Sequence, residues 1–236
     1  VKVCRMEHVR VAVLRPDGGF IESFGARWQG ASLSKPFAVA AVTEGDEWLY
    51  YAHHFLAITD SLGQRLWKVS PAGKALGLVR RSSLGGEGAF GHVAIDYYGN
   101  IFVTDRKAGT IHKFDRHLRY IVAIGEPGTG EGQFDEPRGI SIYRRFGQIF
   151  VSERAGARYF WIGTDVLRFF ADNLVFDTGR KRCRIEVSFL LTEYATISLV
   201  LRDENGKDLF TILPDYILPP GRFTREIEVD CPQAAA

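Results

Sequence analysis

Four copies of a short pattern constrain the fold of this chain more than any other feature of its sequence. Each copy is an apolar run that ends in a polar or charged residue, and a second strand-like run follows it. The four runs are Val1–Arg5, Leu56–Asp60, Ile101–Asp105 and Ile149–Glu153. The last three recur at intervals of about 45–50 residues, and such a period with four short strands per unit is typical of propeller blades. Because one blade cannot bury both of its faces, we expect the units to stack side by side.

The composition agrees with an all-β globular protein. The chain has 17 Phe and 9 Tyr, which favour half-buried strand positions over helices. Its net charge of +2 neither favours nor excludes nucleic acid as a partner. The sequence contains no run approaching the ~18–20 apolar residues that cross a bilayer, so we expect no membrane span.

The repeats divide most of the chain into four units. These are expected at 1–24, at about 36–80, at 90–125 and from Phe134 onward. The second unit carries an insertion at 43–54, and a strand around Val166–Phe170 would complete the fourth. The first unit lacks its first strand and the chain opens with Val1, which predicts an N-terminally incomplete or processed protein. An open first blade also leaves self-assembly of two chains as an alternative.

Two of the units resemble the NHL repeat. The matching segments are Phe90-Gly-His-Val-Ala-Ile-Asp-Tyr-Tyr-Gly-Asn-Ile-Phe-Val-Thr-Asp105 and Gly132-Gln-Phe-Asp-Glu-Pro-Arg-Gly-Ile-Ser-Ile142. They share a Phe before the first strand, Gly-Asn or Gly-Gln, and an apolar run ending in Asp or Glu. The second unit departs through its insertion, and the third lacks the Pro. The resemblance implies an NHL-type β-propeller, of which about four blades of a six-bladed ring are visible.

Residues 166–236 predict a separate domain, after a propeller domain at 1–165. Strands are expected at Cys183–Leu191, Thr196–Arg202, Leu209–Leu213 and Arg222–Val229. Asn205-Gly206 between two apolar runs is a strong hairpin signal. The segments 188–207 and Leu218-Pro-Pro-Gly-Arg222 resemble the small immunoglobulin-like β-sandwich related to the flagellar hook-capping protein. That resemblance implies a bacterial protein that is extracytoplasmic or secreted, with the sandwich used for surface attachment or assembly.

Three cysteines permit at most one disulfide within the chain. Cys183 opens one predicted strand and Cys231 follows another, so antiparallel neighbours would bring the two thiols to the same end of a sheet. Two buried free thiols are the alternative. Cys4 lies in an apolar run and is predicted to be an inert core residue.

Several motifs that could carry chemistry have simpler interpretations. The Gly-rich segments 85–88 and 125–132 precede strands, whereas a phosphate-binding loop precedes a helix. The segment Asp203–Asp208 lacks the ligand spacing of a calcium loop and is better explained as a hairpin tip. The six His residues fall in different units without helical pair spacing, which argues against a zinc site. Asp60, Asp105 and Glu153 recur in equivalent positions, so they are expected to bond turns and neighbouring units rather than a ligand.

We therefore expect a non-catalytic binding or scaffold protein that presents a rigid propeller face to a protein or glycan. No catalytic residue, metal or cofactor is predicted. A hydrolase or lyase with a metal in the propeller channel is one alternative. An NHL module that binds nucleic acid is another, although acidic residues lie among its arginines. The predicted binding residues, from the insertion and the basic positions, are Trp48, Tyr50, Tyr51, His53, Arg106, Arg138 and Arg154.

Overall fold

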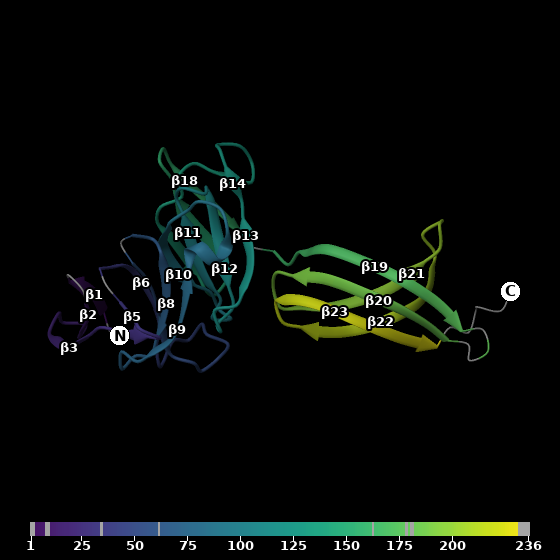
Figure 1. Ribbon diagram of the computed structural model, residues 1–236, viewed down its shortest axis with the longest axis horizontal. Coiled ribbons are helices and arrows are strands. Elements are labelled where there is room, and N and C mark those ends of the chain that lie inside the picture. Colours follow the sequence, from purple (N-terminus) through teal and green to yellow (C-terminus); the bar gives the residue numbers. More distant parts are fainter. Residues whose placement is uncertain are drawn as a thin grey trace. The chain divides into compact units, whose positions relative to one another are not determined.

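The chain is all-β and consists of two compact units, Val1–Ile162 and Gly163–Ala236 (Figure 1). This computed structural model describes residues 3–7, 10–33, 35–60, 62–161, 163–177, 179 and 182–230. Strands dominate this part of the chain, and a short 3-10 helix, η1 (Arg81–Leu84), follows one of them. No helix in the described ranges is long and apolar enough to cross a membrane.

Unit one contains four antiparallel sheets whose strands follow one another in chain order. The first sheet is β1 (Val3–Glu7), β2 (Arg10–Leu14) and β3 (Phe20–Phe24). The second is β6 (Pro36–Val42), β7 (Phe55–Asp60), β8 (Arg65–Val69) and β9 (Ala75–Arg80). The third is β10 (Phe90–Ile95), β11 (Ile101–Asp105), β12 (Thr110–Phe114) and β13 (Tyr120–Ile124). The fourth is β16 (Ile140–Tyr143), β17 (Gln148–Ser152) and β18 (Ala157–Trp161).

Two short strand pairs join these sheets. The hairpin of β4 (Arg27–Trp28) and β5 (Ala31–Ser32) lies between the first and second sheets in the chain. The parallel pair of β14 (Glu126–Pro127) and β15 (Gln133–Phe134) lies between the third and fourth. Most of the second Gly-rich segment, 125–132, forms the loop between β14 and β15.

Each pair of neighbouring sheets in unit one shares an apolar core. Between the first and second sheets lie Val11, Val13, Phe24, Leu56, Ile58, Trp67 and Val69. Between the second and third lie Phe55, Ala57, Leu66, Val93, Ile95, Ile101 and Val103. Between the third and fourth lie Phe102, Ile111, Phe134, Ile149 and Val151. Successive residues of β7 and β11 thus face opposite neighbours, as the two-residue period of a strand requires. The stacked antiparallel sheets confirm the expected all-β fold class.

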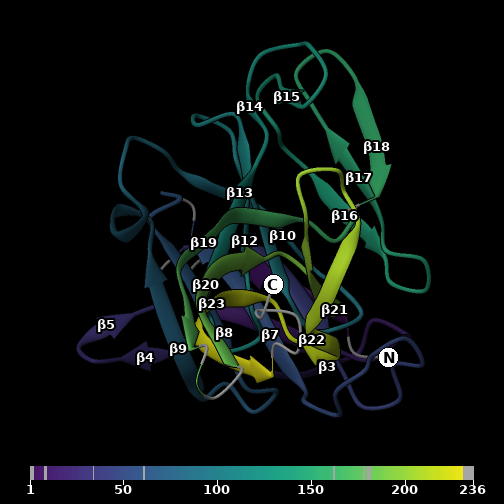
Figure 2. The same cartoon turned by 90° about the vertical axis from the view of Figure 1, so that its right-hand side faces the viewer.

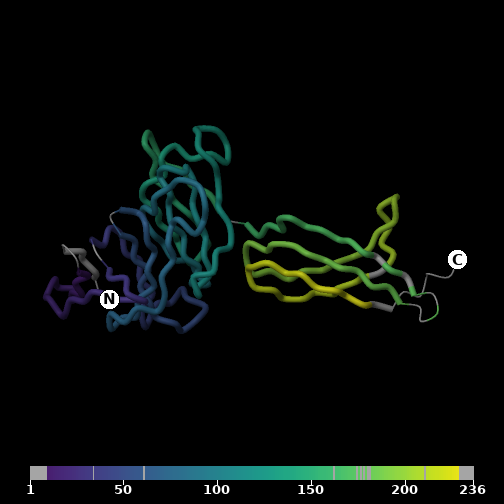
Figure 3. The backbone as a smooth tube through the Cα atoms, in the orientation of Figure 1, coloured from purple at the N-terminus to yellow at the C-terminus, as the bar shows by residue number. Residues whose placement is uncertain are grey.

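Unit two is built from two antiparallel sheets. One contains β19 (Val166–Asp177), β20 (Arg182–Leu191) and β23 (Gly221–Asp230), and the other contains β21 (Ala195–Arg202) and β22 (Asp208–Leu218). Their shared core is formed by Ile185, Val187, Phe189, Leu191, Ile212 and Leu218. The predicted hairpin is confirmed, because Asp203 accepts the N–H groups of Asn205 and Lys207 at 2.9 Å in the turn between β21 and β22. Figure 3 traces this turn as a projecting tip.

Two expectations about this region have different outcomes. The strand around Val166–Phe170 does not complete the fourth sheet, because it is the start of β19 and pairs with β20. Cys183 is disulfide-bonded and lies opposite Val229 on the neighbouring antiparallel strand β23. Its predicted partner Cys231 lies outside the described residues, so that pairing stays a prediction.

Candidate binding surface

The insertion at 43–54 lies at one end of the stacked sheets in unit one. It connects β6 to β7, and the equivalent connections of the third and fourth sheets are the turns at 96–100 and 144–147. The Tyr50 N–H donates to the Tyr97 carbonyl at 2.9 Å, which joins the insertion to the neighbouring turn. We call this end of the unit the aromatic rim. Its members are Trp48, Tyr50, Tyr51, Tyr97, Tyr98, Tyr143 and Phe146, with Arg116, Arg144 and Arg145.

Arg144 fastens three sheets and the insertion together at the rim. Its guanidinium donates to the Ala41 carbonyl of β6 at 2.8 Å and to the Ile95 carbonyl of β10 at 3.0 Å. It also forms an ion pair with Asp46 at 3.0 Å. Asp46 in turn accepts the Thr43 N–H at 2.9 Å, which shapes the start of the insertion. Arg144 is therefore a clamp that supports the surface rather than a group left open for a ligand.

Arg145 has a different environment from its neighbour. Its guanidinium carbon lies 5.0 Å from the ring centroid of Trp48 and 5.0 Å from that of Phe146. All three side chains are exposed to solvent. Cations bind the faces of aromatic rings at such distances, so these two rings hold the Arg145 side chain in place. The result is an ordered cationic group between two exposed aromatic rings.

Tyrosines extend this surface across the third sheet. The ring centroid of Tyr50 lies 4.8 Å from Tyr51, 5.9 Å from Tyr97 and 5.6 Å from Tyr98. Tyr50 nevertheless remains 59% exposed. The turn that carries Tyr97 and Tyr98 needs Gly99, whose φ of 78° lies in the left-handed region. The rim thus presents ordered tyrosine rings on a defined turn.

Asp96 supports the same turn from below. Its carboxylate is buried and accepts hydrogen bonds from Asn100 N at 2.7 Å and Asn100 Nδ2 at 2.8 Å. Burial raises the pKa of the Asp96 carboxyl, although Lys113 and the Asn100 hydrogen bonds oppose that rise. The Asp96 carboxylate is therefore bonded within its own turn.

The far side of the rim joins the insertion to the turn between β12 and β13. The Arg116 guanidinium carbon lies 3.5 Å from the Tyr51 ring centroid, and Arg116 Nε donates to His117 Nε2 at 3.0 Å. Burial and the neighbouring cations lower the pKa of His117, despite the opposing effect of Asp115. A neutral His117 can accept this hydrogen bond. His53 is exposed, with its ring 6.2 Å from that of Tyr51.

A groove runs beneath the rim between the first strands of three sheets. Its volume is about 410 Å³. The floor is formed by small or aliphatic residues of β6, β10 and β16, among them Ala40, Ala94 and Ile142. Trp48 and Arg144 line the rim end of the groove. The rim and groove together place aliphatic side chains beside aromatic and charged groups, as binding sites commonly do.

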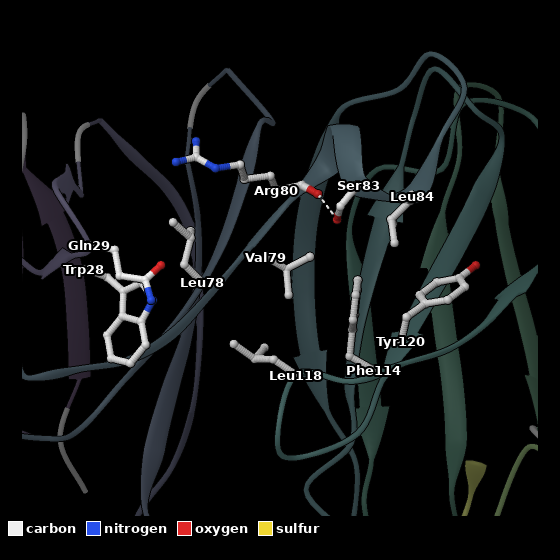
Figure 4. Close-up of a pocket in the computed structure, with 10 residues that line it drawn as sticks. All are labelled: Trp28, Gln29, Leu78, Val79, Arg80, Ser83, Leu84, Phe114, Leu118 and Tyr120. Atoms are coloured by element: carbon white, nitrogen blue, oxygen red, sulfur yellow. Dashed lines mark hydrogen bonds between the residues drawn. The ribbon is translucent and has the colours of Figure 1, made fainter. Parts of the chain in front are cut away.

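A second groove of about 520 Å³ lies on the outer strands (Figure 4). Trp28 and Gln29 face it from one side, and Leu118, Phe114 and Tyr120 line the other. The hydrogen bond drawn there joins the Ser83 hydroxyl to the Arg80 carbonyl at 2.7 Å and serves the η1 turn. Its lining mixes apolar side chains with Gln29, Arg80 and Ser83. The rim is the stronger candidate because it gathers exposed aromatic and cationic side chains beside its groove.

The predicted binding residues fall at opposite ends of the sheets. Trp48, Tyr50, Tyr51 and His53 belong to the rim region. Arg106 and Arg154 follow β11 and β17, and Arg138 precedes β16, which places all three at the other strand ends. Glu136 lies 3.5 Å from Arg106 and 3.3 Å from Arg138, and Asp135 lies 3.1 Å from Arg154. These carboxylates weaken the positive potential that nucleic-acid binding through this end would need.

The recurring acidic residues bond turns and neighbouring segments. Asp60 accepts the Gln64 N–H at 2.8 Å, and Glu153 pairs with Arg158 at 2.7 Å. Asp105 is fully buried and pairs with Arg81 at 2.5 Å. It also accepts the Ala89 and Ala108 N–H groups at 3.0 and 2.9 Å, and His112 Nε2 lies 3.4 Å away. Asp60 and Glu153 thus bond within their own units, and Asp105 also bonds Arg81, which follows the second sheet. Among the described residues, no three His, Cys, Asp or Glu side chains gather closely enough to hold a metal.

Asp105 should make the stability of unit one sensitive to acid. Burial alone would raise the pKa of this carboxyl, but hydrogen bonds from His112, Ala89, Arg81 and Ala108 outweigh it and hold the pKa well below the usual range. The stabilisation is then complete above the unfolded pKa of about 3.9 and is lost as the pH falls below it. Asp105→Asn should be less stable at pH 7 by about 3 kcal/mol, and the difference should narrow below about pH 4. Urea unfolding at a series of pH values checks this, and a constant difference would contradict it.

Several members of the rim were missed by sequence reasoning. Tyr97, Tyr98 and Phe146 lie in the turns that correspond to the insertion in the third and fourth units. Aligning those turns across the repeats could have placed them beside the insertion. Arg144 offered no such signal, because its acceptors include backbone carbonyls 49 and 103 residues away.

No protein-family model and no curated protein matches the chain. Among solved structures, dihydro-haem d1 dehydrogenase NirN is 12% identical, with 92% of this chain and 54% of that chain covered and a TM-score of 0.42. The chain thus spans about half the length of NirN. Virginiamycin B lyase from Staphylococcus aureus is 11% identical, with 94% and 73% covered and a TM-score of 0.41. The Malassezia sympodialis allergen Mala s 1 is 9% identical, with 96% and 88% covered and a TM-score of 0.49. These identities are too low for an activity to be transferred to this chain.

Proposed function

We propose that this chain is a non-catalytic binding and scaffold protein that presents the aromatic rim to a protein partner. The observation that carries the proposal is the ordered Arg145 side chain between the exposed rings of Trp48 and Phe146. Tryptophan, tyrosine and arginine are the residues most enriched among those that dominate the energy of protein interfaces. The rim gathers all three types on one surface.

The support beneath the rim makes the surface suitable for recognition. Arg144 joins three sheets and the insertion, and the Tyr50–Tyr97 backbone hydrogen bond joins two of the connecting segments. Side chains that are already ordered lose less conformational entropy on binding. A partner would therefore meet a preorganised surface rather than a loop that must first fold.

The two units have separate roles in this proposal. Unit one is an NHL-type propeller domain, supported by its stacked antiparallel sheets of three or four strands and by the motifs of its third and fourth units. Unit two is an immunoglobulin-like sandwich that attaches the protein to a surface or assembly, supported by its two packed sheets and its Asn-Gly hairpin. The disulfide at Cys183 supports an extracytoplasmic or secreted location, because disulfides persist in oxidising compartments.

Peptide selection provides a direct test of the rim. Phage-displayed random peptides selected on the chain should yield binders whose affinity falls about 30-fold or more in Trp48→Ala or Arg145→Ala. Arg154→Ala, at the opposite strand ends, is the matched control and should leave their affinity unchanged. Point variants are preferable to deleting 46–54, because that deletion would also remove the Asp46 partner of Arg144.

The outcomes distinguish the alternatives. Peptides that depend on Arg154 rather than Trp48 would move the binding surface to the other end of the sheets. A glycan array probed with the same variants tests the second ligand class. A glycan that binds through Trp48, without any peptide that does so, would replace the protein partner and keep the surface.

A further inference from the structure

The fourth sheet of unit one has one covered face and one open face. Ile149 and Val151 of β17 are buried against the third sheet. On the opposite face, Phe150 is 46% exposed and Trp161 is 59% exposed. Tyr159 lies between them, with its ring centroid 4.8 Å from Phe150 and 4.9 Å from Trp161. Figure 2 shows the three strands of this sheet side by side.

The repeat shows what this open face is built to contact. Phe150 occupies the position in its unit that Phe102 occupies in the preceding one, since Ile149–Glu153 repeats Ile101–Asp105. Phe102 is only 1% exposed, because the fourth sheet packs against it. An equivalent aromatic ring is thus buried between sheets in one unit and open to solvent in the next. The open face of the fourth sheet therefore has the side chains of a sheet-to-sheet contact but no neighbouring sheet against it.

The hydroxyl residue at the fourth position of each repeated run shows the same difference between inner sheets and the fourth sheet. Thr59 of the second sheet donates to the Gly91 carbonyl of the third at 2.7 Å. Thr104 of the third donates to the Arg138 carbonyl at the start of the fourth at 2.8 Å. Ser152 is the corresponding residue of the fourth sheet, where it is exposed and accepts the Gly139 N–H at 2.8 Å. A following sheet would supply the carbonyl that its hydroxyl proton needs.

The first sheet also has an outer face, directed away from the second sheet. Val11 and Val13 of β2 pack against the second sheet, so Leu14 lies on the opposite face. Phe20 of β3 pairs with Leu14 and therefore shares that face, where it is 61% exposed. Along the stack, this outer face of the first sheet points in the same direction as the face of the fourth sheet that carries Ile149 and Val151. That face of the fourth sheet covers Phe102.

We infer that a second copy of this chain covers the fourth sheet with the outer face of its own first sheet. The contact continues the stacking already present between successive sheets, with aromatic residues on one side and Leu14, Phe20 and the exposed Arg10 on the other. Each chain then offers one face of each kind, so two chains form two identical contacts and close a ring with two-fold symmetry. Such burial removes the exposed aromatic residues of both chains from water.

The oligomeric state of the purified 236-residue chain tests this inference. Sedimentation velocity over a wide concentration range should show a dimer. Phe150→Asp and Phe20→Asp should each raise its dissociation constant about 30-fold or more, as loss of a buried interface anchor does. Tyr159→Asp provides a second variant of the same face. Leu62→Asp, in the exposed turn between β7 and β8, is the control for a new charge at an exposed apolar position and should leave the dimer intact.

Mixing the two variants identifies the arrangement. Phe150→Asp retains an intact first sheet and Phe20→Asp retains an intact fourth sheet, so a mixture can form one undamaged contact and should regain association. If two fourth sheets paired instead, Phe20→Asp would form a dimer on its own. A monomeric wild-type chain at all concentrations, or a dimer insensitive to Phe20→Asp, would overturn the inference. Far-ultraviolet circular dichroism of each variant verifies that its strands remain folded.

Discussion

Replacing Arg81 with methionine should lower the free energy of unfolding of unit one by about 3–5 kcal/mol, the cost of leaving a buried charge without its partner. Both members of the Arg81–Asp105 pair are buried, and their closest atoms are 2.5 Å apart. Methionine preserves much of the apolar stem of arginine, so the loss reports mainly on the guanidinium. Urea unfolding followed by tryptophan fluorescence measures the change.

The size of this effect follows from what Arg81 connects. It belongs to η1, after the last strand of the second sheet, whereas Asp105 ends a strand of the third. The same guanidinium donates to the Gly85 carbonyl at 2.8 Å and the Glu87 carbonyl at 3.3 Å. Its removal therefore takes three contacts from the connection between the two sheets and leaves the buried Asp105 carboxylate without its arginine partner.

An exposed ion pair of the same length provides the control. Lys107 and Glu87 also lie 2.5 Å apart, but both side chains are largely exposed. Water screens such pairs, so Lys107→Met should leave the unfolding midpoint unchanged. Equal losses of unfolding free energy in Arg81→Met and Lys107→Met would show that burial does not determine how much the Arg81–Asp105 pair stabilises the unit.

The pattern of the strands was readable from the sequence because it depends on local rules. The runs Leu56–Asp60, Ile101–Asp105 and Ile149–Glu153 predicted three strands at equivalent positions, and the turn residues around Asn205 predicted a hairpin. Alternation along these strands is set by the two-residue period of β structure. The start of β19 was misassigned because an apolar strand does not reveal which sheet it will join.

The candidate site was only partly readable for a different reason. Aromatic residues in the insertion pointed to a surface, but Arg106, Arg138 and Arg154 were grouped with them on charge alone. The structure places those arginines at the opposite strand ends, beside Glu136 and Asp135. Which strand end a loop occupies depends on strand direction within the stack, and composition carries no information about that.

Arg144 and Arg145 show that the roles of two adjacent identical residues can be told apart only in a structure. Their side chains begin one position apart in the turn after β16, yet one is bonded to three segments and the other lies between two exposed rings. Most of the bonds of Arg144 are to carbonyl groups, which every residue possesses. A backbone acceptor leaves no trace in the sequence that would identify its donor.

Arg144→Met should destabilise unit one by about 2–4 kcal/mol, because it removes charge-assisted hydrogen bonds and leaves the Ala41 and Ile95 carbonyls without this donor. Asp46 also loses its cationic partner, so the insertion should become more mobile. Urea unfolding measures the first effect, and limited proteolysis within 43–54 measures the second.

The matched control is Arg145→Met, one residue away. Loss of its exposed cation–π contacts should cost less than about 1 kcal/mol, and the insertion should stay resistant to protease. The same variant should nevertheless bind rim-selected peptides poorly, whereas Arg144→Met should lose both stability and binding. Similar stability losses in the two variants would contradict the division of roles, because the clamp and the contact residue would then be indistinguishable. A stable Arg144→Met protein with normal peptide binding would show that the sheets hold the rim in place without the clamp.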